Sequence, residues 1–353
     1  MNIIHILYGM GMGGIETMLL NIANEQVKTN RVGIIVINNI AEPSLIEKFN
    51  KKVDLYFLKR EVGSFNPFFI LKLNHLLYKI KPDIIHLHYN SIFRFLFLPN
   101  LKKKCCVTLH DVCSPVNAKY LHKFDRIYSI SNVVKENVRR VKHLDSEVVL
   151  NGIKPDLIIK KESLTPAAGV FKIVQLGRLM HEKKGQHILI DAVRLLEEKG
   201  IHTIQLFFIG EGESEEYLKN RVDRYNMNNN VFFLGIQTQD FVFQHLHEYD
   251  LLVQPSIYEG FGLTVAEGMA AGIPVLVSKQ QGPLEIIDQG ECGYYFESED
   301  PQSCAAMILK IMNDPDKPTI VEKAYRRVYE LYNVANTAAN YLKKYEEILN
   351  GKE

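Results

Sequence analysis

The chain has 353 residues, of which 46% are hydrophobic and 24% are charged. This length exceeds what one core usually holds and the composition is that of a folded protein, so we expect two domains and no disordered tract. The five cysteines form no CxxC pair, which argues against a disulfide framework or a zinc site and favours a reducing compartment. The opening segment lacks a basic n-region, and no apolar run is long enough for a membrane span, so we expect a cytoplasmic protein.

The formal net charge of +1 hides a difference between the two halves. Residues 1–158 carry 22 Lys and Arg against 13 Asp and Glu, whereas residues 159–353 carry 20 against 28. A basic first half suits an anionic lipid surface or a polyprenyl-diphosphate acceptor, because each cation near such a surface contributes about 1 kcal/mol. A solvated surface explains the excess equally well, and we expect no nucleic-acid partner. Peripheral contact with the inner face of the cell membrane is therefore one of two open expectations.

Apolar runs alternate with longer helical patterns along the chain, which is typical of βαβ units and parallel sheets. The strands expected in the first half lie at 2–8, 31–38, 53–58, 83–89, 104–110, 126–131 and 147–153. Those expected in the second half lie at 171–178, 204–210, 231–235, 251–256, 273–278 and 292–296. Each half alone would form a Rossmann-like sheet, so the expected fold class is α/β.

The polar stretch at 154–169 is the only plausible linker between these halves. We therefore expect one Rossmann-like domain over 1–159 and a second over 160–333. An amphipathic helix over 334–353 completes the chain.

The segment SIFRFLFLPNLKKK, residues 91–104, has the appearance of an amphipathic membrane anchor. No charge interrupts its apolar run after Arg94, however. The pattern therefore favours a core helix that leads through a basic loop to the strand at 104–110.

The loop at 9–14 matches GxGxxG between an expected strand and an expected helix, the pattern of a dinucleotide site. Such a site also needs an acidic residue about 20 positions further on, to bind the ribose 2′-hydroxyl. Here the second strand ends at Asn38 and Asn39, and no acid follows before Glu42. The missing acid argues against an NAD site but does not exclude an NADP site.

A second candidate phosphate-binding element follows the strand at 171–178. Arg178 is followed by a short loop with Lys183, Lys184 and Gly185 before the next helix. A guanidinium and an ammonium placed there suit a leaving nucleoside diphosphate, whose negative charge grows as the glycosidic bond breaks. The register of the lysine is ambiguous, and we favour Lys184.

Two glutamates, Glu259 and Glu267, flank a glycine turn between an expected strand and an expected helix. Free backbone N–H groups and the positive end of the helix dipole can hold a diphosphate at such a turn. Glu259 stands at the mouth of the turn and Glu267 lies inside the helix. The pair suggests a nucleotide-sugar site, although surface glutamates are common.

Three histidines lie near the ends of strands in the first half, where ligands bind in open α/β folds. His86 and His88 point to the same side of a strand, and His110 ends the next strand. No carboxylate cluster accompanies them, so we expect no metal.

The string EGFGLTVAEGMAAGIPVLVS, residues 259–278, resembles the EX7E motif of retaining glycosyltransferases of family 4, which have the GT-B fold. The element at 178–185 resembles the GR-x(n)-KG motif of the same family. Weaker matches extend the resemblance over nearly the whole chain. The resemblance implies two Rossmann-like domains that face a cleft, an acceptor-side domain over 1–159 and a nucleotide-sugar-binding domain over 160–333. It also implies that the C-terminal helix over 334–353 crosses back to the first domain.

The resemblance also implies roles for individual residues. The expected catalytic residues are His110, Glu259, Arg178 and Lys184. The expected diphosphate-binding residues are Gly13, Gly14, Arg178, Lys184, Gly260, Phe261 and Gly262. The nucleoside is expected at Glu267, Leu263, Thr264, Gly210 and Gly235. His88 is a candidate on the acceptor side, and no cofactor is expected.

The function that follows is metal-independent, retaining transfer of a hexosyl or N-acetylhexosaminyl group from a UDP- or GDP-sugar to a hydroxyl acceptor. A lipid-linked glycan intermediate of surface polysaccharide synthesis is the expected acceptor. The alternatives are a GT-B nucleotide-sugar epimerase or hydrolase, an NAD(P)-dependent Rossmann enzyme, and a binding protein without turnover.

Overall fold

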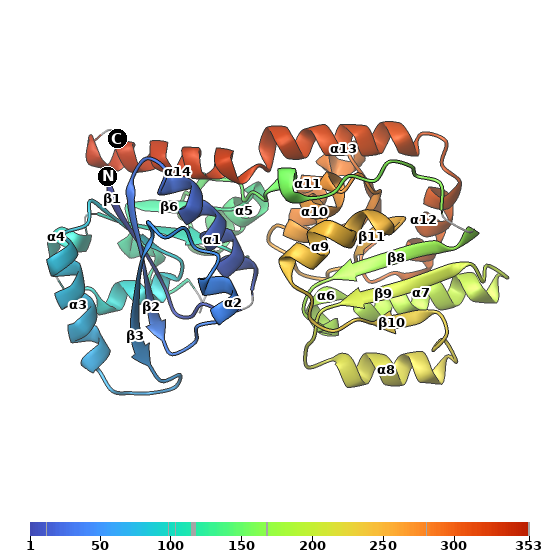
Figure 1. Ribbon diagram of the computed structural model, residues 1–353, viewed down its shortest axis with the longest axis horizontal. Helices are drawn as coiled ribbons and strands as arrows, with labels where there is room; N and C mark the ends of the chain where they lie inside the picture. The colour runs from blue at the N-terminus through green and yellow to red at the C-terminus, as the bar shows by residue number, and fades with distance from the viewer. Residues whose placement is uncertain are drawn as a thin grey trace. The chain divides into compact units, whose positions relative to one another are not determined.

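The computed structural model describes residues 1–11, 13–97, 99–102, 104–113, 118–166, 169–279 and 281–351. The chain forms two compact units, each built around one parallel sheet (Figure 1). The first unit comprises Met1–Gly152 and Asn333–Glu353, and the second comprises Ile153–Tyr332. The expected α/β class with two Rossmann-like sheets is confirmed.

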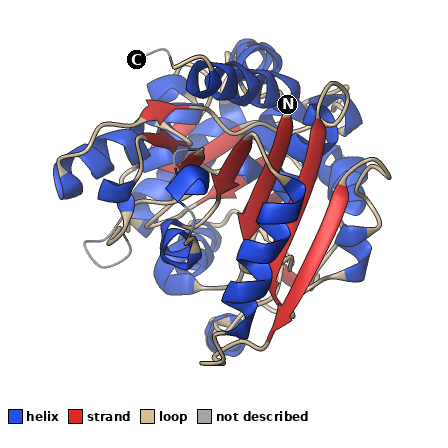
Figure 2. Cartoon of the chain, turned by 90° about the vertical axis from the view of Figure 1, so that its left-hand side faces the viewer, coloured by secondary structure: helices blue, strands red, loops and turns tan. Residues whose placement is uncertain are grey.

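The first sheet has seven parallel strands in the order β3-β2-β1-β4-β5-β6-β7. Its strands are β1 (Asn2–Leu7), β2 (Arg31–Asn38), β3 (Asp54–Arg60), β4 (Ile84–Leu87), β5 (Cys105–Leu109), β6 (Arg126–Ser129) and β7 (Glu147–Val148). Each begins within two residues of an expected run. Helices lie in front of and behind these strands (Figure 2), which explains why the central strands are apolar on both faces.

Six α-helices accompany the first sheet within the described residues. They are α1 (Gly14–Gln26), α2 (Pro43–Ile46), α3 (Phe68–Ile80), α4 (Pro99–Lys102), α5 (Asn132–Lys142) and α14 (Val334–Leu349). Two 3-10 helices, η1 (Asn90–Phe95) and η2 (Leu121–Lys123), complete this unit. Helix α14 comes from the far end of the chain and packs against α1 and the sheet, burying Tyr341 and Tyr345.

The segment at 91–104 was expected to form one core helix followed by a basic loop, and the structure instead divides it into two short helices. The described part of this segment forms most of η1 and the four-residue α4. The first of them ends where Leu96 becomes extended, and Pro99 takes the first position of α4, which proline favours. Ile92 and Leu96 are buried, whereas Arg94 and Phe97 are exposed. Leu98 and Lys103 lie outside the described residues.

The second sheet has six parallel strands in the order β10-β9-β8-β11-β12-β13. Its strands are β8 (Phe171–Leu176), β9 (Ile204–Ile209), β10 (Val231–Phe233), β11 (Leu251–Gln254), β12 (Val275–Ser278) and β13 (Tyr294–Phe296). Its α-helices are α6 (His181–Lys184), α7 (Gln186–Glu198), α8 (Glu215–Arg224), α9 (Gln239–His245), α10 (Leu263–Ala270), α11 (Gln281–Ile286), α12 (Pro301–Asn313) and α13 (Lys317–Leu331). The 3-10 helices η3 (Pro155–Leu157), η5 (Leu246–Glu248) and η6 (Asp288–Gly290) also belong to this unit.

The units divide after Gly152, earlier than the expected boundary after residue 159. The segment that follows Gly152 hydrogen-bonds within the second unit. The amide of Ile153 donates to the Tyr332 carbonyl at 2.8 Å, and that of Ile159 donates to the Phe243 carbonyl at 3.0 Å. Composition identifies a polar linker, but these backbone bonds decide which sheet it joins.

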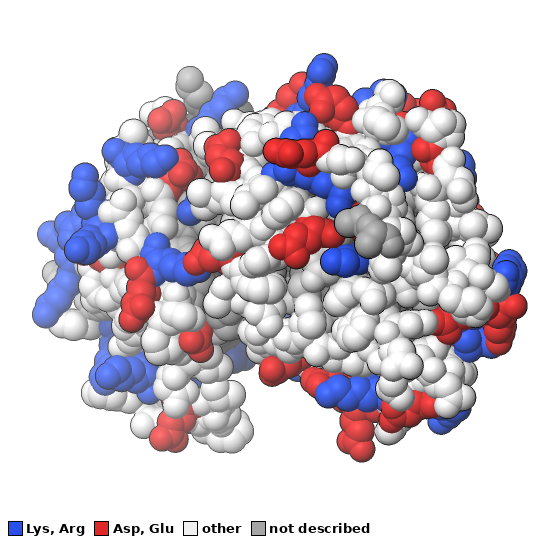
Figure 3. Space-filling model, turned by 45° about the vertical axis from the view of Figure 1, so that its right-hand side comes forward, with Lys and Arg blue, Asp and Glu red and all other residues white. Residues whose placement is uncertain are grey.

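The charge difference between the halves is visible on the surface. Lys and Arg side chains gather along the left edge of Figure 3, over the first unit. Among the described residues, no helix combines the length and the hydropathy that a bilayer crossing requires.

Candidate functional site

In the second unit, the candidate residues gather where the strand order of the sheet reverses. Strands β8 and β11 are neighbours although β9 and β10 lie between them in sequence. Ligands of open α/β sheets bind outside the carboxyl ends of strands at such a switch point. Arg178 follows β8 and Glu259 follows β11. The topology therefore brings the two motifs to one edge of the sheet.

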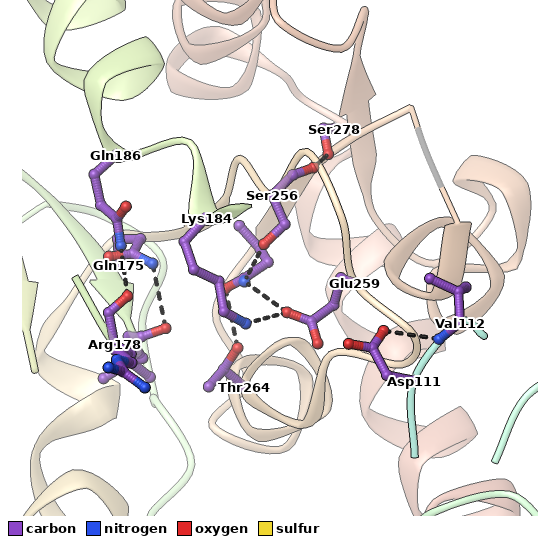
Figure 4. Close-up of polar contacts among 12 residues, drawn as sticks. Asp111, Val112, Gln175, Arg178, Lys184, Gln186, Ser256, Glu259, Thr264 and Ser278 are labelled. Carbon is purple, nitrogen blue, oxygen red and sulfur yellow. Dashed lines mark hydrogen bonds and ion pairs between the residues drawn. The ribbon is translucent and has the colours of Figure 1, made fainter. Parts of the chain in front are cut away.

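Lys184 and Glu259 form an ion pair at this edge (Figure 4). Their side chains are 20% and 19% exposed, so the pair is largely shielded from water. Gly185, with φ of +68°, ends α6 directly after Lys184. A Cβ atom there would lie 2.0 Å from the carbonyl oxygen of Pro255, so only glycine lets α6 come this close to the loop that carries Glu259.

A polar network behind this pair holds the loop. The Gln254 amide nitrogen donates to the Ser256 hydroxyl at 2.7 Å, and the Thr264 hydroxyl donates to the Gln254 amide oxygen at 3.1 Å. The Gln254 nitrogen also lies 3.5 Å from the Glu259 carboxylate. The sequence analysis missed Gln254; its signal was a buried polar residue at the end of an apolar strand.

Helix α10 begins with a turn suited to an anion. Gly262 caps it in the left-handed region at φ of +105°, and no side chain caps the helix there. The first N–H groups of a helix have no partner within the helix. Phe261 is buried against Tyr332, with the ring centres 5.6 Å apart. Gly260, Phe261 and Gly262 can therefore serve a ligand only through their backbone.

Glu267 lies one turn further along α10. Desolvation raises the pKa of its carboxyl group to about 8, so the group is mostly neutral at pH 7. Within the described residues, no hydrogen-bond donor is recorded for this carboxyl group. Hydroxyl groups of a ligand that donated hydrogen bonds to this carboxyl group would favour its ionised form.

Arg178 points away from the ion pair of Lys184. Its Nε donates to Glu213 at 3.0 Å, and both side chains are exposed, at 67% and 48%. Gln186 fixes the backbone here, because its amide nitrogen donates to the Arg178 carbonyl at 3.0 Å. The guanidinium of Arg178 is thus held by Glu213 through Nε and does not join the Lys184–Glu259 pair.

The two glycines predicted to bind the nucleoside lie together. The amide of Gly210 donates to the carbonyl of Gly235 at 2.9 Å. Both follow adjacent strands, β9 and β10, and both have positive φ. Gly210 also packs on Gly177, just before Arg178.

In the first unit, a pocket of about 590 Å³ opens at the carboxyl ends of β4 and β5. His88 and His110 line it, together with the cations Arg94 and Lys119. Asp111, which also lines it, accepts a hydrogen bond from the amide of Val112 at 2.9 Å (Figure 4). The two histidines singled out for the acceptor side and for catalysis therefore share one pocket.

Three histidines form a hydrogen-bonded chain that reaches this pocket, and a fourth lies beside it. His5 on β1 contacts Gln26 at 2.8 Å and His88 at 3.1 Å, and His88 contacts His110 at 2.9 Å. His86 instead bonds Tyr345 of α14 at 2.6 Å. The sequence analysis missed His5, whose register opposite His86 on the neighbouring strand is a tertiary feature.

The direction of these bonds fixes the tautomers of neutral rings. With the Gln26 amide oxygen as acceptor, Nε2 of His5 donates and its Nδ1 accepts from Nε2 of His88. Nδ1 of His88 then accepts from Nε2 of His110, which leaves Nδ1 of His110 unprotonated. Burial lowers the pKa of His5 and of His110 to about 4 and that of His88 well below its usual range, so the rings are neutral at pH 7.

His5, His86 and His88 place three ring nitrogens within 4.8 Å of one another, a spacing compatible with a metal ion. Their rings stack, with interplanar angles of 22° for His86 on His88 and 29° for His5 on His88. Each nitrogen has a hydrogen-bond partner in Gln26, Thr108, Tyr345 or another histidine. This geometry favours hydrogen bonding by the rings over metal binding, because stacked rings do not direct their lone pairs at a single point.

A glutamate, Glu16, lies against the glycine loop of the first unit, which the GxGxxG motif does not reveal. Gly13 precedes α1, which begins at Gly14, and a Cβ atom on Gly13 would lie 2.4 Å from the Glu16 carboxylate. Desolvation raises the pKa of Glu16. An anion at Gly13 would have to displace this carboxylate. Met12 lies outside the described residues.

An asparagine lies at the end of β2, where an NAD enzyme needs an acid. Asn38 ends β2, and its side-chain oxygen accepts from Arg60 at 3.0 Å.

Comparisons with known proteins agree with this arrangement. Residues 158–328 match the family Glycosyl transferases group 1, and residues 12–157 match Glycosyltransferase Family 4. An uncharacterized glycosyltransferase of Methanocaldococcus jannaschii is 28% identical over 297 residues, 75% of each chain. The amylovoran biosynthesis glycosyltransferase AmsK of Erwinia amylovora is 29% identical over 169 residues, 46% of this chain and 41% of that one.

Solved structures share the fold. Anabaena HepE in complex with UDP-glucose superimposes with a TM-score of 0.83 at 20% identity, over 98% of this chain and 100% of that one. WaaG, a glycosyltransferase involved in lipopolysaccharide biosynthesis, gives 0.75 at 17% identity, over 96% and 99%. The NAD(P) alternative has no support among these relatives. Two parallel sheets, the motifs at their edges and the two family matches lead to one conclusion: the chain belongs to the GT-B glycosyltransferases of the family 4 type.

Proposed function

We propose that this glycosyltransferase moves a sugar from a UDP- or GDP-sugar to a hydroxyl acceptor with retention of the anomeric configuration and without a metal. The observation that carries the proposal is the Lys184–Glu259 ion pair beside the open first turn of α10. The pair places a cation that can bind the diphosphate next to a carboxylate that can bind the sugar. That HepE is solved with UDP-glucose supports a nucleotide-sugar donor.

We assign the donor as follows. Lys184 and, once released from Glu213, Arg178 bind the diphosphate together with the backbone at Gly260–Gly262. Glu267 binds the ribose hydroxyls, and the backbone at Gly210 and Gly235 borders the base. Lys184 is preferred over Lys183 because it contacts Glu259.

The transfer step needs no enzymatic nucleophile. The acceptor oxygen forms a bond to the anomeric carbon on the face from which the diphosphate departs. The bonding electrons leave with the phosphate oxygen, and that oxygen takes the proton of the acceptor hydroxyl. Fixed cations stabilise the growing charge, and loss of one such contact typically costs about 3 kcal/mol of transition-state stabilisation.

The first unit supplies the remaining assignments. Nδ1 of His110, unprotonated in the histidine chain, can accept a hydrogen bond from a sugar hydroxyl. His88 holds it in this tautomer, and the amides at Gly13 and Gly14 are assigned to a phosphate group. We assign the acceptor to the pocket at His110, and a lipid-linked glycan intermediate fits its two cations, Arg94 and Lys119.

A thermal-shift series tests the donor site, because a ligand that binds only the native state stabilises by RT ln(1 + [L]/Kd). We expect UDP or GDP and the matching sugar conjugates to raise the melting temperature, and NAD(P)H to leave it unchanged. Arg178→Ala should remove most of the shift. The matched control is Arg326→Ala, an exposed arginine paired through Nε to Glu322 at 2.9 Å. A shift with NAD(P)H alone would overturn the proposal.

A further inference from the structure

Helix α3 lies on a flank of the first unit (Figure 1), and several of its apolar side chains are exposed. It buries one stripe, as an amphipathic helix should: Phe69, Leu73, Asn74 and Leu77. The opposite face should be polar, yet Phe68, Leu71 and Tyr78 are 55%, 60% and 65% exposed. The loop before the helix adds Val62 and Phe65, which are exposed as well.

The segment after η1 extends this face. Asn74 lies in the same helical row as Leu71 and Tyr78, at spacings of three and four residues. Its side-chain oxygen accepts from the amide of Phe97 at 2.9 Å, which holds the exposed Phe97 beside the helix. We call the resulting surface the apolar patch, and its members are Val62, Phe65, Phe68, Leu71, Tyr78 and Phe97.

The surroundings of the apolar patch are strongly basic. The described residues among 62–104 include six Lys and Arg but a single acid, Asp83. That carboxylate accepts a hydrogen bond from the amide of Asn2 at 2.8 Å. Lys72 lies 5.2 Å from the ring centre of Phe68, and Lys79 is exposed on the same helix. The basic side chains along the left edge of Figure 3 lie over this unit.

Arg94 connects this flank to the histidine pocket. A smaller pocket of about 440 Å³ is lined by Phe93, Arg94, Lys102, Tyr120, Lys123 and Asp125. Arg94 and Tyr120 also line the pocket of His88 and His110. A phosphate held by the cations of the smaller pocket would therefore lie next to the space in front of His110.

We propose that the apolar patch and the cations around it dock onto an anionic lipid bilayer. Exposed aromatic and aliphatic side chains among Lys and Arg on one helix are the features of an interfacial membrane helix. A second copy of the chain is disfavoured as the occupant, because pairing this basic flank with itself would bring like charges together. The inference depends on the proposed function only for the role of docking, which is to deliver a lipid-linked acceptor to His110.

Vesicle co-sedimentation of the full chain tests the docking surface. The vesicles contain either phosphatidylcholine alone or phosphatidylcholine mixed with phosphatidylglycerol. We expect binding to the mixed vesicles only, weakened at least about tenfold in Phe65→Ser/Phe68→Ser/Leu71→Ser and in Lys72→Glu/Lys79→Glu. The matched controls, Leu157→Ser for an exposed apolar residue and Lys51→Glu/Lys52→Glu for exposed cations, should bind as the wild type does.

Two results would overturn this surface: no binding to mixed vesicles, or binding that both patch variants retain. A dimer in light scattering that the patch variants dissociate, without vesicle binding, would make the patch a self-association face and would also overturn it. The nucleotide thermal shift is measured on the same proteins. A shift kept in patch variants that no longer bind vesicles supports the docking surface, whereas a wild type that shows no shift contradicts the donor site alone.

Discussion

At the scale of single residues, Glu267 stands out because it is an acid held neutral. Its carboxyl pKa of about 8 lies above the usual value of 4.5, and desolvation is the cause. The stability that its neutral form contributes is therefore complete below about pH 4.5 and is lost as the pH rises through 8. Ribose hydroxyls would donate hydrogen bonds to the ionised form and lower this pKa.

This titration gives a prediction for ligand binding. When UDP or GDP binds at pH 7, Glu267 should release close to one proton, which calorimetry in buffers of different ionisation enthalpy measures. Glu267→Gln should abolish the release and should raise the melting temperature of the unliganded protein at pH 8 to 9. Glu216→Gln, at an exposed site on α8, should change neither. Proton release that persists in Glu267→Gln would contradict the assignment of this residue to the ribose.

At the scale of elements, the histidine chain joins β1, β4 and β5 on the face of the first sheet that α14 covers. His86 bonds Tyr345, and Thr108 bonds Tyr341 at 2.9 Å. Burial lowers the pKa of all four histidines, to about 4 for His5 and His110. Asp111 raises the pKa of His110, but desolvation outweighs this effect.

Acid should therefore destabilise the first unit in a definite window. The unfolded chain binds protons at its histidines below about pH 6.5, whereas the folded histidines stay neutral to about pH 4. Stability is thus complete above 6.5 and falls as the pH falls, by up to about 1.4 kcal/mol per pH unit for each histidine. Urea unfolding followed from pH 8 to pH 4 measures this slope.

A variant tests whether His5 takes part in this acid dependence. His5→Gln should remove about one proton from the slope, and the exposed His75→Gln should leave the slope unchanged. If the free energy of unfolding does not change between pH 7 and 5, the buried histidines do not carry the acid sensitivity.

The elements themselves were the easiest part to predict. Twelve of the thirteen strands in the described residues lie within the expected apolar runs, and β3 extends past its run to Arg60. Strands of parallel sheets are buried on both faces and therefore leave continuous apolar stretches. The segment at 91–104 was predicted wrongly because its apolar side chains divide between the core, as Ile92 does, and the surface, as Phe97 does. Hydropathy alone cannot make that division.

The sequence offers candidate site residues within short motifs, but it does not identify their partners in space. Glu259 and Lys184 come from separate motifs, and only the fold makes them an ion pair. His5 and Gln254 sit in strands whose neighbours the sequence does not specify. The contact of Glu213 with Arg178 and that of Glu16 with the loop at Gly13 depend on how the fold places these side chains.

At the scale of the whole molecule, the two units differ in how the chain builds them. The second is one continuous segment, Ile153–Tyr332, whereas the first needs Asn333–Glu353 from the other end. Helix α14 buries Tyr341 and Tyr345 against the sheet, and each such ring removes about 150–250 Å² from water. At about 25 cal/mol per Å², exposing both costs on the order of 10 kcal/mol, comparable with the whole stability of a domain.

Excised segments should therefore behave unequally. Residues 153–332 alone should unfold cooperatively in urea and keep the nucleoside diphosphate shift, because the segment holds its complete sheet and the second-unit donor residues. Residues 1–152 alone should lack a cooperative transition, and addition of a peptide of residues 333–351 should restore one. The same peptide with Tyr341→Ser and Tyr345→Ser is the control and should fail. A fragment 1–152 that unfolds cooperatively without the peptide would show that α14 covers the first sheet without being needed to fold it.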